Sequence, residues 1–83
     1  MRDAEKILVA LYFKEAFSES SAIQPMGWMK RETIDKLVEK GFLSKYHGKI
    51  SLTLKGTNAA MLIVRKKIDS GEGIDKIKKE IGF

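Results

Sequence analysis

The chain has 83 residues with a formal net charge of +5, 43% hydrophobic residues, one proline and no cysteine. This length and composition predict one globular domain, residues 1–83, and they exclude disulfides and thiolate metal sites. The longest apolar runs, Ile7–Phe13 and Ala59–Val64, are far shorter than the roughly 20 residues that span a bilayer, and the N-terminus lacks signal-peptide features, so we expect a cytoplasmic protein with no membrane partner.

The first predicted element is a helix from Asp3 to Phe17, a segment without glycine or proline. One of its faces is formed by residues at helical spacing, namely Ala4, Ile7, Leu8 and Leu11, while its other sides carry Val9, Tyr12 and Phe13. A helix that is apolar nearly all round must be covered on more than one face. The cover comes either from the rest of this domain or from another chain.

A break follows at residues 18–27. Serines that favour caps and turns occur at Ser18, Ser20 and Ser21, and Pro25 cannot continue a helix from before it. The segment is compatible with a short helical turn within Ser20–Gln24.

The next predicted helix runs from about Trp28 to Lys40. Ile34, Leu37 and Val38 lie on one face of it, which we expect to be buried. Gly41 is a natural terminator, because glycine adopts the left-handed conformation that often ends a helix.

A β-hairpin is predicted over Phe42–Tyr46 and Lys49–Leu54, because the apolar residues here alternate with polar ones. A two-residue loop, His47-Gly48, joins the strands. This loop fixes the register as Leu43 opposite Leu52 and Lys45 opposite Ile50. Lys45 is then expected to lay its stem along the apolar face and extend its ammonium beyond the hairpin tip.

Two C-terminal helices are predicted, one from about Leu54 to Asp69 with Thr53 as its N-cap, and a short one from about Ile74 to Ile81 that packs back on the body. The run Ala59–Val64 occupies the whole circumference of the longer helix, which is more than one small domain can cover. A homodimer is therefore expected, with an interface at Met61, Leu62 and Ile63.

Two sequence runs carry a resemblance to a known family: Thr33 to Leu43, which reads TIDKLVEKGFL, and Leu52 to Gly56, which reads LTLKG. Their spacing resembles that of winged helix-turn-helix transcription regulators, closest to the multiple-antibiotic-resistance-repressor and phenolic-acid-repressor types, over about residues 28–58. The class expected is mainly α with a small β-hairpin (α+β), a winged helix-turn-helix with a C-terminal dimerisation helix. The core would span residues 3–54 and the C-terminal helices residues 54–83. One departure is that the second helix must be short, distorted or missing.

The charge of the chain is concentrated in its middle. Residues 28–67 carry ten Lys or Arg against Glu32, Asp35 and Glu39, giving +7, whereas residues 1–27 and 68–83 each give −1. A localised basic field favours a polyanionic partner, and a generic solubilising surface is the alternative. We therefore expect double-stranded DNA as the partner.

In domains of the resembled type, the recognition helix meets bases in the major groove and the wing tip touches phosphates or the minor groove. The helical wheel of residues 28–40 places a basic and polar set on one outward flank and the acidic residues on the other, with a salt-bridged surface helix as the alternative. Cations in the first helical turn and at the hairpin tip would meet phosphate, or else be simply solvated. The expected DNA-binding residues are Met29, Lys30, Arg31, Thr33, Lys36, Lys40, Lys45, His47 and Lys49.

No enzymatic activity, metal or cofactor is expected. His47 is the single histidine, and no cysteine or second histidine completes a site with it. Trp28 is expected to anchor packing at the entrance of its helix, whereas Tyr46 is equally balanced between packing and base stacking. The alternative function is a winged-helix protein-interaction module within a larger assembly. RNA binding is a third reading, disfavoured because stacking aromatics are few.

Overall fold

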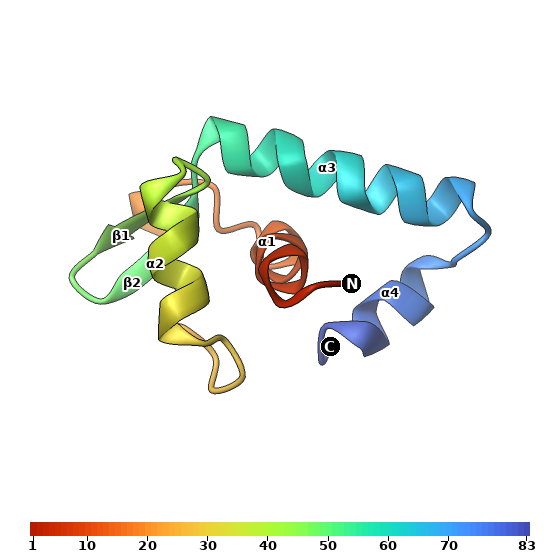
Figure 1. Ribbon diagram of the computed structural model, residues 1–83, viewed down its shortest axis with the longest axis horizontal. Helices are drawn as coiled ribbons and strands as arrows, with labels where there is room; N and C mark the ends of the chain where they lie inside the picture. Colours follow the sequence, from red (N-terminus) through yellow and green to blue (C-terminus); the bar gives the residue numbers. More distant parts are fainter.

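The computed structural model describes residues 1–83 and contains four α-helices, a short 3₁₀ turn and a two-stranded antiparallel sheet (Figure 1). In chain order the elements are α1 (Asp3–Phe13), η1 (Glu19–Ser21), α2 (Arg31–Glu39), β1 (Leu43–Tyr46), β2 (Lys49–Leu52), α3 (Leu54–Asp69) and α4 (Ile74–Glu80). The predicted class, mainly α with a small β-hairpin, is confirmed. None of the helices combines the length and the apolar character needed to cross a membrane.

Helix α1 lies at the centre of the domain. All five residues from Ile7 to Leu11 are buried, each at most 5% exposed. Helices α2 and α3 and strand β2 contact α1, and the C-terminal Phe83 ring lies 6.3 Å from that of Phe13. Figure 1 shows α1 end-on below α3, with α2 and the hairpin on one side and α4 on the other. The domain itself therefore covers both apolar sides of this helix.

Helix α1 ends four residues earlier than predicted. Glu15 adopts a positive φ of 56°, which turns the chain after the C-cap Lys14. The turn allows Ala16 to be fully buried and its carbonyl to accept a hydrogen bond from the Leu52 amide at 2.7 Å. Left-handed backbone is uncommon for a glutamate, so no local signal marked this end of the helix.

Strand β2 pairs with β1 on one side and forms a single β-bridge with Ile23 on the other. Its register with β1 is the one predicted, with Leu43 opposite Leu52 and Lys45 opposite Ile50. On its other side, the amide and carbonyl of Ile50 exchange hydrogen bonds of 2.8 and 3.0 Å with Ile23. The segment 18–27 therefore contributes one bridge and the 3₁₀ turn η1, and it forms no full second helix.

The hairpin loop consists of two residues in left-handed conformation, His47 at φ 48° and Gly48 at φ 78°. Positive φ at both central positions is the geometry of a type I′ turn, whose twist matches that of the flanking strands. Glycine supplies this conformation at Gly48 without steric cost.

Thr53 connects the hairpin to both α2 and α3. Its side-chain oxygen accepts a hydrogen bond from the Gly56 amide at 3.0 Å, as predicted for an N-cap. The same hydroxyl donates to the carbonyl of Gly41 at 2.6 Å, just beyond α2. One side chain therefore satisfies polar groups at the start of α3 and beyond the end of α2.

Lys55 and Gly56 complete this connection, and we call residues 53–56 the joint. The Lys55 ammonium donates to the carbonyl of Lys40, the C-cap of α2, at 2.9 Å, and it lies 4.6 Å from the centre of the Phe42 ring. Gly56 is buried where α3 passes the Phe42 backbone so closely that a Cβ at this position would stand 2.0 Å from the Phe42 carbonyl oxygen. The LTLKG run thus holds the hairpin, the end of α2 and the start of α3 together.

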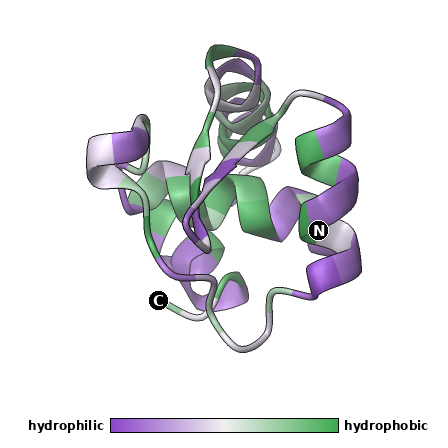
Figure 2. Ribbon diagram, turned by 90° about the vertical axis from the view of Figure 1, so that its left-hand side faces the viewer, coloured by the Kyte–Doolittle hydropathy of each residue, from purple (hydrophilic) through white to green (hydrophobic).

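Helix α4 folds back on the domain through two fully or nearly fully buried isoleucines, Ile77 within the helix and Ile81 at its C-cap. Figure 2 shows that hydrophobic residues lie mostly towards the middle of the molecule and hydrophilic residues on the outer sides of the helices. At the edge of α4, Glu80 accepts a 2.8 Å hydrogen bond from the N-terminal ammonium and lies 3.7 Å from the Lys67 ammonium. These contacts join the end of α4 to residue 1 and to α3.

This ion pair makes the attachment of α4 sensitive to acid. The hydrogen bond from the N-terminal ammonium, opposed by burial, holds the pKa of Glu80 below its ordinary value. A carboxyl group with a lowered folded pKa stabilises the fold above its unfolded pKa, and this contribution is lost as pH falls through the folded pKa.

We therefore expect the wild type to lose more thermal stability than Glu80→Gln between about pH 6 and about pH 3, with the two proteins converging at the acid end. Melting temperatures measured by circular dichroism across this range test the prediction. Glu39→Gln, which removes an exposed carboxylate without an ion pair, is the control and should follow the wild type. Parallel curves for wild type and Glu80→Gln would contradict it.

Candidate nucleic-acid interface

Helix α2 presents one face to the core and a charged face to solvent. Ile34 and Leu37 are buried at 4% and 5% exposure. The exposed positions carry three cations and three anions, and Thr33 is half-buried beside them; the exposed set is Arg31, Glu32, Asp35, Lys36, Glu39 and Lys40.

The outermost line of α2 is acidic. Since a helix turns about 100° per residue, Glu32 and Glu39 lie opposite the core-facing side. Lys36 and Lys40 lie on one side of this line, and Arg31 with Asp35 on the other. The predicted basic flank is present as Lys36 and Lys40, but the three acidic residues do not form the opposite flank, because Asp35 shares it with Arg31 while Glu32 and Glu39 are outermost. The basic flank is turned partly towards α1, because Lys36 and Lys40 border a groove with Asp3.

Met29 does not belong to this surface. Its side chain is 5% exposed and forms part of the core, so its predicted place among the DNA-contacting residues is wrong. The reason is that α2 begins at Arg31 and not at Trp28. The Met29 amide donates to the Met26 carbonyl at 2.9 Å in a turn before the helix, and the helical wheel does not apply there.

The cations at the start of α2 differ in their surroundings. The Lys30 ammonium lies 3.6 Å from the Asp3 carboxylate, and both side chains are well exposed. Arg31 is exposed and has no ion-pair partner. Trp28, in the preceding turn, is 39% exposed and borders a groove shared with Ile81 and Gly82 after α4. Arg31 is therefore the free cation at this end of the helix.

Lys45 lies differently from its predicted position beyond the hairpin tip. Its ammonium is 3.7 Å from the Asp35 carboxylate of α2, with both side chains partly exposed. Asp35 is thus paired with a basic neighbour, and the hairpin is tied to the helix. A groove of about 220 Å³, bordered by Arg31, Lys45 and Gly48, marks the place where the two elements meet.

The tip of the hairpin is formed by Tyr46, His47 and Lys49, all of which are exposed. Tyr46 is 53% exposed, and its ring meets that of His47 edge-on at 4.2 Å between centroids. Lys49 has no ion-pair partner. The tip therefore combines an aromatic pair with a free cation.

The three residues expected at a dimer interface separate in the structure. Met61 and Leu62 are 45% and 56% exposed, whereas Ile63 is half-buried and packs against the core. Ile63 therefore supports the fold of the domain itself, because α3 turns this side towards α1. The sequence did not single out Ile68, which is 46% exposed on the same helix.

No family model, curated protein or solved structure was found to match this chain.

Proposed function

We propose that this protein binds double-stranded DNA as a homodimeric transcription regulator of the winged helix-turn-helix type. The observation that carries the proposal is the pairing of α2 with the hairpin, joined by Lys45 and Asp35 at 3.7 Å, with the unpaired cations Arg31 and Lys49 on these elements. The order helix, 3₁₀ turn, helix, hairpin and helix supports the resemblance, except that a 3₁₀ turn stands where such domains carry a second helix. The cytoplasmic location expected from the sequence remains part of this proposal.

The charge distribution favours phosphate contact over extensive base reading. The acidic line of Glu32 and Glu39 would repel phosphates if α2 entered a groove with its outermost face first. An approach led by Arg31 and the hairpin tip keeps that line away from the backbone, and pairing with Lys45 neutralises Asp35. Among the base-reading candidates, Lys36 is exposed, Thr33 is half-buried, and Lys40 lies at the far end of the helix.

Wing and helix variants should affect DNA binding differently. Lys49→Ala is expected to weaken binding to all duplexes by about tenfold for a dimer, because it removes phosphate contacts. Lys36→Ala should instead reduce discrimination between duplexes by about 1–3 kcal/mol where a base contact is lost. Fluorescence anisotropy on a panel of duplexes measures both effects.

Lys76→Ala is the matched control, because it removes an exposed lysine from α4, on the other side of α1 from the hairpin (Figure 1). It should bind as the wild type does. If Lys49→Ala and Lys36→Ala also bound every duplex like the wild type, DNA recognition by this surface would be abandoned. The acidic line on α2 would then favour the alternative, a module that docks on another protein.

A further inference from the structure

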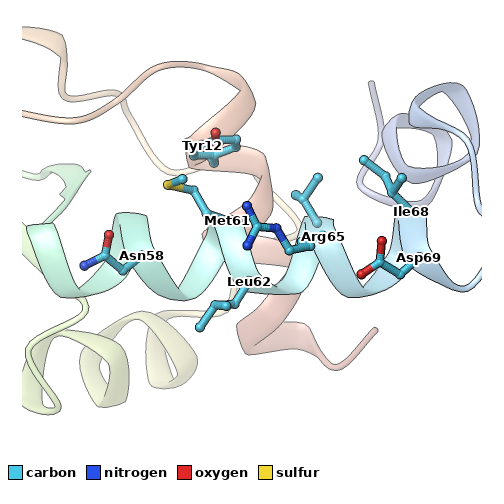
Figure 3. Close-up of a pocket in the computed structure, with 8 residues that line it drawn as sticks. Tyr12, Asn58, Met61, Leu62, Arg65, Ile68 and Asp69 are labelled. Carbon is cyan, nitrogen blue, oxygen red and sulfur yellow. The ribbon is translucent and has the colours of Figure 1, made fainter.

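Helix α3 exposes an apolar strip beside α1. Met61, Leu62 and Ile68 are 45%, 56% and 46% exposed, and Phe17, which follows α1, is 44% exposed. Together with the half-buried Tyr12 of α1, residues of α3 form an open groove of about 570 Å³. Figure 3 shows Met61 and Arg65 extending towards Tyr12, and Leu62 on the other side of the helix.

No part of residues 1–83 covers this strip. Helix α4 does not cover the strip, because it packs on the core. Ile77 and Ile81, at its C-cap, are buried there, and Phe83 lies against Phe13. Each large apolar side chain left in water forgoes about 1.5–3 kcal/mol of burial. Covering the strip with another molecule would therefore be energetically favourable.

The charged residues beside the strip indicate what kind of molecule covers it. Arg65 and Asp69 both line the groove, and neither forms an ion pair within the chain. An interface between two identical copies related by a two-fold axis must be complementary to itself, so a charge within it must be matched by the opposite charge in the same patch. This patch carries one cation and one anion a single helical turn apart.

We propose that a second copy of this chain docks on this strip, with the two α3 helices antiparallel and each Arg65 paired with Asp69 of the other copy. With the two-fold axis near residue 66, Leu62 of one copy lies two residues along the helix from the level of Ile68 of the other. Since a helix rises about 1.5 Å per residue, Asp69 of the second copy then lies about 3 Å along the helix from Arg65, within the reach of an arginine side chain. The inference specifies the homodimer proposed above, but it does not depend on DNA binding.

Charge reversal tests the reciprocal pairing by analytical ultracentrifugation without DNA. Arg65→Asp leaves two acidic residues in each patch, and Asp69→Arg leaves two basic ones. Either variant alone is expected to raise the dimer dissociation constant by about tenfold or more, because like charges then face each other across the axis. An equimolar mixture of the two variants should form a heterodimer close to the wild type in affinity. The double variant, in which the charges are exchanged, should dimerise as well.

Leu62→Glu supplies a test of the apolar contact and should also dissociate the dimer. Leu54→Glu is its matched control, because Leu54 is an 80% exposed leucine on α3 that does not line the groove. A wild type that is monomeric at about 500 µM, a concentration well above that expected for a stable dimer, would overturn the proposal. So would charge variants that stay dimeric alone, or variants that are folded by circular dichroism but remain monomeric when mixed.

Discussion

The affinity of the wild-type protein for duplex DNA is expected to fall about 10³- to 10⁴-fold as salt rises from about 50 to about 200 mM. If each subunit neutralises about three or four phosphates, a dimer releases enough counterions for a slope of log K against log salt of roughly −5 to −7. Four cations at the start of α2 and on the hairpin, Lys30, Arg31, Lys45 and Lys49, match that number, although Lys30 and Lys45 already contact Asp3 and Asp35. Anisotropy titrations at four or more salt concentrations measure the slope.

The hairpin should account for a defined share of this slope. Lys45→Ala combined with Lys49→Ala removes up to four cations from a dimer and should flatten the slope by about 2 to 3.5. Because Lys45 already contacts Asp35, the Lys49→Ala change alone should produce the larger part of this loss. Lys76→Ala combined with Lys78→Ala removes the same charge from exposed positions of α4 and should leave the slope unchanged. A salt-independent affinity for DNA would contradict the proposed contacts with phosphate.

Gly56→Ala is expected to destabilise the domain by about 3 kcal/mol or more, a large fraction of the roughly 4–12 kcal/mol typical of a domain of this size. Alanine in place of glycine usually stabilises a helix interior by about 1 kcal/mol. Here the added Cβ would stand 2.0 Å from the Phe42 carbonyl oxygen and 3.2 Å from a Leu52 methyl group. Backbone atoms cannot rotate aside, so α3 must move off the hairpin and strain the hydrogen bonds of Thr53.

Urea unfolding followed by circular dichroism measures this loss. Gly27→Ala is the control, because a Cβ at Gly27 meets nothing within 4 Å and its φ is not positive. That variant should stay within about 0.5 kcal/mol of the wild type. A Gly56→Ala protein as stable as the wild type would show that α3 and the hairpin do not approach as closely as described.

Features set by local chemistry were predictable from the sequence. The bounds of α3, Leu54–Asp69, agree with the prediction because Thr53 caps its start and Ser70 and Gly71 follow its end. The hairpin register was predictable because a loop of two residues allows only one pairing of the two strands.

Features that depend on contacts between distant segments were not predictable. The Ile23 bridge to Ile50 joins residues far apart in the chain, and nothing in the pattern around Ile23 indicates a strand. The position of the Lys45 ammonium depends on Asp35 of another element. The cover of α1 could have come from another chain, and only the packed structure shows that its own domain supplies it.

The joint at residues 53–56 has a consequence for the spacing of the DNA half-sites that a dimer would bind. Hydrogen bonds from Thr53 and Lys55 and the close backbone approach at Gly56 fasten the end of α2 and the hairpin to the start of α3. In the proposed dimer the two α3 helices pair with each other, so the separation of the two α2 helices is set by this joint and not by a flexible linker. The fixed separation of the two α2 helices would then select half-sites about one helical turn of DNA, or about 34 Å, apart. Inserting a few base pairs between the half-sites would place the second one out of its reach.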